Sequence, residues 1–229
     1  SIKSAETSST CHTESLSIRT TNIWVRAALH QVFKIPSQEY EPALVLGEKF
    51  TPGNDASHFC KPTDVAVASN GVFFVADGYC NSRLMKFAPD GMLMEILDQG
   101  EFDTPHSLAL IEEEDLICVA DREHHSIRCF SAGLYNPKDV GVEKQTINDP
   151  RLGRVYAIDY ANGNLYAVNG PEADSPAHGF TIDVSTGEIK ETWQPAEGFG
   201  SPHDVTASWT GTEVYVGDIG KNRPWKFQR

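Results

Sequence analysis

Apolar and polar residues alternate along most of this chain with a period of two, and turn-forming pairs interrupt the alternation every few residues. The turns are Asn-Gly, Asp-Gly and Thr-Gly pairs, as at residues 70–71, 90–91 and 186–187. This pattern predicts short antiparallel strands joined by hairpins. No segment sustains an apolar period of 3.6 residues, so we expect little helix and an all-β fold.

One phrase recurs along the chain. It opens with Pro, continues through two apolar strands of which the second ends in Asp, and closes with a third strand that ends in an aromatic residue. Three clear copies, PTDVAVASNGVFFVADGYCNSRLMKF, PHSLALIEEEDLICVADREHHSIRCF and PHDVTASWTGTEVYVGDIGKNRPWKF, start at Pro62, Pro105 and Pro202. The distance from Pro to Asp is 15 or 16 residues in each copy. Fainter copies start at Thr13 and Arg154.

The spacing of these copies predicts the architecture. The five starts lie 43 to 49 residues apart, close to the ~40–50 residues of a four-stranded propeller blade. A β-sandwich is also all-β, but it would not repeat one phrase five times. We therefore predict a β-propeller domain over residues 13–229 with about five visible blades, preceded by a polar lead-in over residues 1–12.

Charge and hydropathy exclude two classes of partner. The 229 residues carry 32 Asp and Glu against 19 Lys and Arg, a formal net charge of −13. A chain this acidic repels phosphate backbones, so we predict no nucleic-acid binding. The longest apolar segments, such as Val72–Ala76, are much shorter than the ~20 residues of a membrane helix, so we predict no membrane span.

The cysteines offer two interpretations. Four of the five form local pairs about 20 and 11 residues apart, and neither pair is a CxxC motif, which argues against a zinc knuckle or a thioredoxin-type site. In a secreted chain each pair could close a short loop as a disulfide. The alternative is buried, reduced thiols. The pairs are Cys60 with Cys80 and Cys118 with Cys129, and Cys11 is left over.

The first strand of every propeller blade lines the central channel, so residues at one phrase position form a ring. The position after the opening Pro holds Thr63, His106 and His203, and the alignment gives Glu14 in the first copy. Two imidazoles and a carboxylate are a workable zinc set, and the alternative is histidines that only hydrogen-bond across the channel. Asp204 points away from its neighbour along an extended strand. It is either a calcium ligand or a strand-start Asp that caps a turn.

These motifs resemble a known family. The similarity lies in the strings HFCKPTDVAV, VADGYCNSR, PHSLAL, CVADRE, YAVNG, PHDV and WKF. From about Leu16 to Phe227 the chain is similar to peptidyl-α-hydroxyglycine α-amidating lyase, an NHL-repeat propeller of six blades. The resemblance implies cleavage of peptides that end in α-hydroxyglycine into an amidated peptide and glyoxylate, with Zn²⁺ in the channel and a structural Ca²⁺. It also implies a secretory-pathway or extracellular protein that serves peptide amidation, including neuropeptide processing.

The resemblance assigns roles residue by residue. In the reaction the carbinolamide hydroxyl loses a proton and the amide nitrogen then leaves, so zinc would polarise the hydroxyl, a tyrosine would act as base and an arginine would hold the carboxylate. The assignments are zinc at His106 and His203, catalysis at Tyr79 and Arg122, calcium at Asp204 and the Leu16 carbonyl, and disulfides Cys60–Cys80 and Cys118–Cys129.

The chain also departs from the family pattern. Glu14 stands where the family has its first zinc histidine, and Ser201 stands where the family has a methionine. The family's N-terminal segment, which carries a catalytic arginine, has no counterpart before Ser1, so the sequence indicates an N-terminally truncated or divergent member. Glu with two His still makes a zinc set. The alternative function is a catalytically impaired propeller that binds peptides or proteins, and zinc content would distinguish the two.

Overall fold

The computed structural model of the chain describes residues 22–36, 39–97, 100–172 and 175–229. Within these residues the backbone forms eighteen strands in five antiparallel sheets. Helix is limited to one α-helix of four residues and three short 3₁₀ turns, so the all-β prediction is confirmed. The predicted boundary between residues 12 and 13 lies outside the described residues. None of the described helices is long and apolar enough to cross a membrane.

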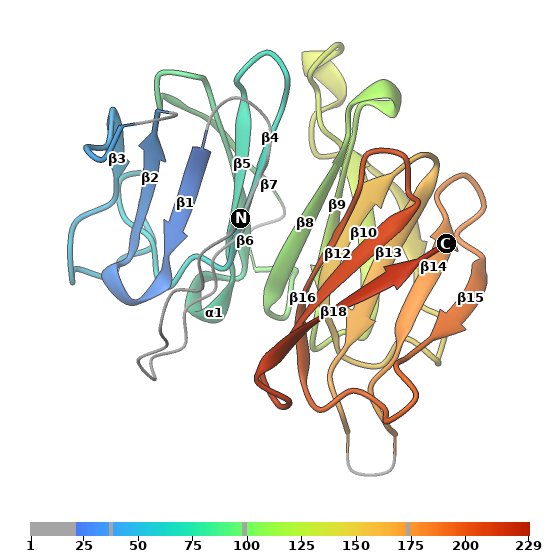
Figure 1. Ribbon diagram of the computed structural model, residues 1–229. Coiled ribbons are helices and arrows are strands. Elements are labelled where there is room, and N and C mark those ends of the chain that lie inside the picture. The colour runs from blue at the N-terminus through green and yellow to red at the C-terminus, as the bar shows by residue number, and fades with distance from the viewer. Residues whose placement is uncertain (1–21, 37–38, 98–99, 173–174) are drawn as a thin grey trace.

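The sheets follow the chain from the blue end to the red end of Figure 1. The first contains β1 (Asn22–Arg26), β2 (Gln31–Ile35) and β3 (Leu44–Leu46). The second contains β4 (Asp64–Val67), β5 (Phe73–Asp77), β6 (Arg83–Phe87) and β7 (Leu93–Leu97), with α1 (Gly78–Asn81) between β5 and β6. The third contains β8 (Pro105–Ile111), β9 (Leu116–Asp121), β10 (Ser126–Ser131) and β11 (Glu143–Ile147).

The remaining two sheets complete the series. The fourth contains β12 (Val155–Ala161), β13 (Asn164–Asn169), β14 (Gly179–Asp183) and β15 (Ile189–Trp193). The fifth contains β16 (Pro202–Ala207), β17 (Glu213–Asp218) and β18 (Arg223–Gln228). The 3₁₀ turns are Ala27–Leu29, Glu112–Glu114 and Pro137–Asp139.

The first strands of successive sheets lie side by side. β4 packs beside β8, β8 beside β12 and β12 beside β16, while β1 lies next to β4. The five sheets are therefore blades arranged around a shared axis, and the prediction of a propeller with about five blades is confirmed. In the repeated phrase β1 corresponds to β5, and residues 13–21, with which that copy begins, lie outside the described residues.

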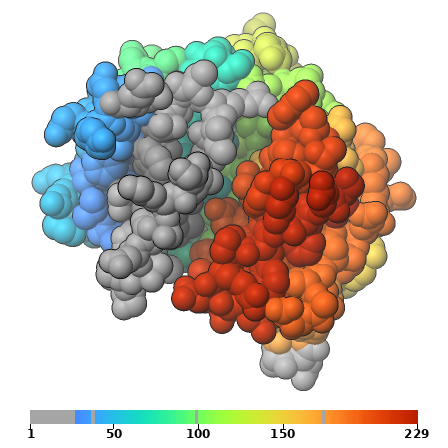
Figure 2. All heavy atoms as spheres, viewed as in Figure 1, coloured from blue at the N-terminus to red at the C-terminus, as the bar shows by residue number. Residues whose placement is uncertain are grey.

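Apolar side chains fill the spaces between blades. One cluster packs between the third and fourth sheets and includes Ile127, Leu152 and Phe180, all buried. The inner strands β5 and β6 are buried on both faces because a blade covers each side of their sheet. In β17 only one face is covered, so Val214 and Val216 are buried while Tyr215 between them is exposed. Atoms of the fifth sheet, red in Figure 2, accordingly lie on the face of the molecule that is turned toward the viewer.

Polar side chains link the first strands of neighbouring blades. The Asp64 carboxylate on β4 accepts a hydrogen bond from the Leu108 amide of β8 at 2.8 Å. The Ser107 hydroxyl on β8 accepts from the Ile158 amide of β12 at 3.1 Å. The Asp159 carboxylate on β12 accepts from the Ala207 amide of β16 at 2.8 Å. These bonds satisfy backbone donors that no strand ladder reaches, since the first strands of different blades do not pair.

The Asp that ends the second strand of each clear copy anchors the loop leading into its own blade. Asp77 accepts from the Cys60 amide, Asp121 from the Asp103 amide and Asp218 from the Ser201 amide, each at 2.8 Å. The constant distance from Pro to Asp in the sequence therefore reflects a repeated side-chain cap. This cap fixes the start of the strand that lines the channel.

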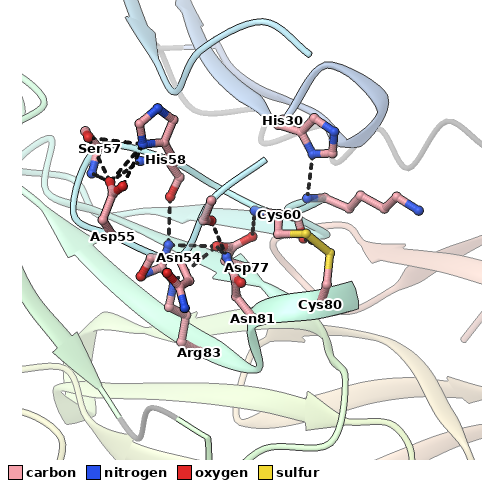
Figure 3. Close-up of polar contacts among 12 residues, drawn as sticks. His30, Asn54, Asp55, Ser57, His58, Cys60, Asp77, Cys80, Asn81 and Arg83 are labelled. Carbon is pink, nitrogen blue, oxygen red and sulfur yellow. Dashed lines mark hydrogen bonds and ion pairs between the residues drawn. A yellow bond between two sulfur atoms is a disulfide. The ribbon is translucent and has the colours of Figure 1, made fainter. Parts of the chain in front are cut away.

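In the second blade the cap is extended by a buried ion pair, shown in Figure 3. The guanidinium of Arg83, which is fully buried, lies 3.0 Å from the Asp77 carboxylate. It also donates to the Asn54 and His58 carbonyl oxygens at 2.6 and 2.7 Å. Because every one of these groups has partners, the pair can remain charged away from water.

Two disulfides connect neighbouring parts of single blades. Cys60 pairs with Cys80 across a Cα–Cα distance of 5.5 Å, and Cys118 pairs with Cys129 across 4.0 Å. Cys118 and Cys129 are directly opposite each other on β9 and β10. The pairing implied by the family resemblance is therefore confirmed, and the alternative of reduced thiols is wrong for these four residues.

Candidate functional site

Three first strands carry a β-bulge at the same phrase position. In β8 Pro105 and Ser107 pair with consecutive residues of β9, so the residue between them, His106, is unpaired. Tyr156 in β12 and His203 in β16 are skipped in the same way. A bulge bends its strand and redirects the extra side chain. The three bulges turn these rings toward one another.

The three rings form a triangle. Their centroids are 4.9 Å apart for His106 and His203, 5.2 Å for His106 and Tyr156, and 5.2 Å for Tyr156 and His203. The structure thus brings together the two histidines singled out from the sequence. Thr63, at the same phrase position directly before β4, donates instead to the Pro105 carbonyl oxygen at 2.7 Å and takes no part in the triangle. Glu14, the fourth predicted member, lies outside the described residues.

Hydrogen bonds fix the tautomer of His106. Its Nδ1 lies 2.5 Å from the Tyr156 carbonyl oxygen and must donate, so the lone pair of the neutral ring is at Nε2. The Tyr79 hydroxyl lies 3.0 Å from that Nε2 and can donate to it. Burial, with the nearby His203 and Arg122, lowers the pKa of His106 to about 3. The ring is therefore neutral at physiological pH.

Tyr79 is presented by α1, a single turn held from both ends. Cys80 ties the turn to Cys60, and Asn81 donates to the Asp77 carboxylate at 2.6 Å (Figure 3). A Cβ at Gly78 would lie only 2.1 Å from the Pro105 carbonyl oxygen, so only glycine lets the turn approach β8 this closely. The phenol is consequently held against His106.

Arg122 follows β9 and faces both tyrosines. Its guanidinium carbon lies 5.6 Å from the centroid of the Tyr79 ring and 5.1 Å from that of Tyr156, within cation–π range. Its Nε donates to Glu123 at 2.8 Å. Burial, followed by the positive charge of Arg122, lowers the pKa of His203. Both histidines of the triangle therefore favour the neutral form that binds metal ions.

Asp204 comes directly after the bulged histidine of β16. Its side chain is accessible to solvent and accepts from the Val205 amide at 2.9 Å, as a strand-start Asp does. Desolvation by the surrounding protein, together with the negative charges of Asp64 and Asp159, raises the pKa of Asp204 to about 7. Leu16, the other predicted calcium ligand, lies outside the described residues.

The donor set can be compared with what zinc requires. In the described part of the chain, no group of three or more His, Cys, Asp and Glu side chains is placed to hold a metal ion. His106 and His203 are two neutral imidazoles, and the Nδ1 of His106 is held by a backbone carbonyl, as is usual for a metal-binding histidine. The pair fits two positions of a zinc site, and Glu14 is the predicted third ligand.

Sequence reasoning missed three residues of this site. Tyr156 completes the triangle, and it could have been found by aligning Val155, rather than Arg154, with the opening Pro of the phrase, which places Tyr156 at the ring position. Glu123 and Arg154 could not have been found in this way. They meet through an ion pair between the β9–β10 turn and the approach to β12, 31 residues apart in the sequence.

The class of protein follows from the fold and from a match to a known repeat. The NHL repeat model matches residues 59–87 and 102–130, which span β4–β6 and β8–β10 with the loops that Asp77 and Asp121 anchor. A chain in the crystal structure of a Nidogen/Laminin complex superposes with a TM-score of 0.63 at 17% identity, covering 78% of this chain and 60% of that one. The chain is an NHL-repeat β-propeller.

Curated relatives narrow the class further. Peptidyl-glycine alpha-amidating monooxygenase B of Xenopus laevis is 47% identical over 223 residues, and Peptidyl-alpha-hydroxyglycine alpha-amidating lyase 2 of Drosophila melanogaster is 41% identical over 215 residues. Each alignment covers 90% of this chain. The chain is thus a relative of the peptidyl-α-hydroxyglycine α-amidating lyases, as its motifs predicted. It spans 25% of the frog protein and 52% of the fly protein.

Proposed function

We propose that this chain is a lyase that cleaves peptides ending in α-hydroxyglycine into a C-terminally amidated peptide and glyoxylate. The observation that carries the proposal is the Tyr79 hydroxyl 3.0 Å from His106 Nε2, with His203 and Arg122 beside it. The relatedness to amidating lyases supports the same reaction. The substrate is accordingly a peptide, bound by its C-terminal residue.

The reaction is a proton transfer followed by cleavage of a C–N bond. The hydroxyl of the α-hydroxyglycine gives up its proton, its oxygen lone pair forms the carbonyl of glyoxylate, and the C–N bond breaks. The electron pair of that bond stays on the amide nitrogen, which takes up a proton. Tyr79 is the proposed base for the hydroxyl proton, since its oxygen faces the centre of the site. Arg122 stabilises negative charge on that oxygen and holds the substrate carboxylate.

The proposal includes two metal ions. Zinc is assigned to His106 and His203 with Glu14 as the third ligand, supported by the neutral imidazoles and the backbone acceptor that orients His106. Bound zinc would act as a Lewis acid that makes the substrate hydroxyl more acidic. Calcium is assigned to Asp204 and the Leu16 carbonyl, since hard cations take oxygen ligands.

The proposed location is the secretory pathway or the extracellular space. Disulfides persist in oxidising compartments and are rare in the cytosol. The pairs Cys60–Cys80 and Cys118–Cys129 support this location, and so does the relatedness to enzymes of peptide amidation.

The direct test uses the purified chain, zinc, and a peptide that ends in α-hydroxyglycine. We expect glyoxylate and amidated peptide in equal amounts, measured by a colorimetric aldehyde assay and by mass spectrometry. Absence of glyoxylate above the uncatalysed background would refute the lyase. Peptide binding without turnover, in a chain that retains no zinc, would instead support the alternative of a peptide-binding propeller.

Metal content supplies a second readout. We expect about one zinc per chain in the purified protein, lost in His106→Ala and His203→Ala and retained in His178→Ala, whose ring lies 2.9 Å from the nearby Pro176 carbonyl oxygen. Elemental analysis after gel filtration measures this. Equal zinc in all four proteins would contradict the assignment of these two ligands.

A further inference from the structure

We propose that Arg154 is a positioning residue for carboxylate recognition, because it shares Glu123 with Arg122 and keeps a net positive charge at the candidate site. The inference rests on the proposed function and identifies which residues select a substrate with a free C-terminal carboxylate.

Glu123 is shared by the two arginines. Its Oε1 accepts from Arg122 Nε at 2.8 Å and also from Arg154 Nη2. The backbone holds the carboxylate in place, since the Glu123 amide donates to the Asp103 carbonyl oxygen at 3.0 Å. Both guanidinium groups face Tyr156, whose ring centroid lies 5.1 Å from the Arg122 carbon and 5.9 Å from the Arg154 carbon.

Arg122 keeps its terminal nitrogens for a ligand. Glu123 occupies only its Nε, and the described residues supply no hydrogen-bond partner for Nη1 or Nη2. The side chain is 13% exposed, so the guanidinium is held firmly and only a limited edge can be reached. Two parallel N–H groups on one guanidinium match the two oxygens of a carboxylate.

Arg154 changes the net charge of the cluster that it forms with Arg122 and Glu123. Arg122 and Glu123 alone would form a neutral pair with little attraction for an anion. The second guanidinium leaves one net positive charge on the three side chains. Glu172 also acts on Arg154 and offsets part of its charge; the same carboxylate lies 3.3 Å from His125, which is charged only when protonated. Arg154 is also close to the triangle, because its guanidinium carbon lies 5.9 Å from the centroid of the Tyr156 ring.

The position of Arg154 leaves a buried polar atom unsatisfied, which an ion pair that served stability alone would avoid. Its Nε is the one buried side-chain nitrogen or oxygen, within the described residues, that lacks a hydrogen-bond partner. A buried donor without a partner destabilises the fold. The ring beneath it is also closely fitted, since a Cβ at Gly170 would lie 2.2 Å from Tyr156 Cε2. An arrangement that costs stability and directs charge to the site is typical of a functional group.

The test compares two substrates in steady-state kinetics. One is a peptide ending in α-hydroxyglycine, and the other is the same peptide with that carboxylate capped as a methyl ester. We expect Arg154→Gln to raise KM for the acid about tenfold, with kcat within about twofold, and to leave the ester unaffected. Arg154→Lys keeps the charge and should recover most of the loss. The control is Arg151→Gln, since Arg151 is exposed and pairs with Asp149.

A binding experiment separates this inference from the proposed function. A peptide ending in unmodified glycine has no hydroxyl to deprotonate, so its affinity can be measured by calorimetry whether or not the chain is a lyase. We expect wild-type protein to prefer the free acid over its C-terminal amide by about tenfold and Arg154→Gln to lose that preference, with the melting temperature recorded for both proteins. An equal preference in both proteins, or an equal KM for the acid, overturns the inference. Absence of glyoxylate from wild-type protein, with the preference intact, overturns only the lyase.

Discussion

At the scale of single residues, the site depends on which nitrogen of His106 carries the proton. The Tyr156 carbonyl oxygen takes the Nδ1 proton, so Nε2 is left as an acceptor for the Tyr79 hydroxyl or for a metal ion. Neither neighbour of Tyr79 is close in the sequence, because His106 follows 27 residues later and Arg122 comes directly after β9, the next strand of that blade. The tyrosine is therefore useful only in the folded blade pair.

Removing one hydroxyl tests the proposed base. Tyr79→Phe keeps the ring against Arg122 and loses only the oxygen, so we expect kcat to fall by about 10²- to 10⁴-fold, the usual contribution of a general acid or base. The melting temperature should change little. Glyoxylate release under saturating peptide measures the effect, and Tyr135→Phe is the control because Tyr135 is 69% exposed on a distant loop. A loss of less than about threefold would remove Tyr79 from the mechanism.

At the scale of elements, short turns between strands position the chemistry. The α1 turn is held by the Cys60–Cys80 disulfide and by Asn81, while the bulges in β8, β12 and β16 direct the three rings. The second disulfide joins β9 to β10 and lies in the apolar core between blades. The two disulfides should therefore differ in their effect on activity.

We predict that Cys60→Ala with Cys80→Ala lowers both stability and activity. Opening a loop of this size costs about 3 kcal/mol in the chain-entropy description, and it also frees the turn that carries Tyr79. Cys118→Ala with Cys129→Ala should cost a similar free energy of unfolding and leave kcat nearly unchanged below the melting transition. Urea denaturation and glyoxylate assays at 10 °C separate the two effects. Equal kcat values in the two double variants would contradict this view of the turn.

At the scale of the whole molecule, the blades are joined by apolar packing and by a regular series of polar links near the axis. Asp64, Ser107 and Asp159 each satisfy a backbone donor of the next blade. The apolar clusters exclude water, but they do not fix how the first strand of one blade is aligned with that of the next. The polar links do, because each needs one donor at one distance.

Breaking one link should weaken the whole propeller. Asp64→Ala leaves the Leu108 amide without its acceptor and removes one of two acceptors of the Ser107 hydroxyl, so we expect a loss of about 1–3 kcal/mol in the free energy of unfolding. Asp64→Asn retains an acceptor oxygen and should lose less. Glu95→Ala, an exposed change on β7, should stay within about 0.5 kcal/mol. Chemical denaturation measures all three, and an Asp64→Ala variant as stable as Glu95→Ala would show that the link contributes nothing.

Much of the fold could be predicted because its signals are local and repeated. The alternation of apolar residues gives strands, the Pro-to-Asp spacing gives blades, and the shared phrase position of His106 and His203 anticipates their meeting across the axis. The shared role of Glu123 could not be predicted. It depends on Arg154 in another blade, and a charged residue in a turn has the same local pattern whether it is solvated or paired.

The sequence by itself determined the class of strands, the number of blades, the relatedness to amidating lyases and the cysteine pairs that this relatedness implied. Each of these depends on residues close together in the chain or on a motif repeated along it. Only the tertiary structure decided which residues leave the strand ladder as bulges and which charges share a partner. Bulges depend on hydrogen-bond register between strands, and the Arg122–Glu123–Arg154 group depends on contact between blades, so neither has a period or a spacing that the sequence displays.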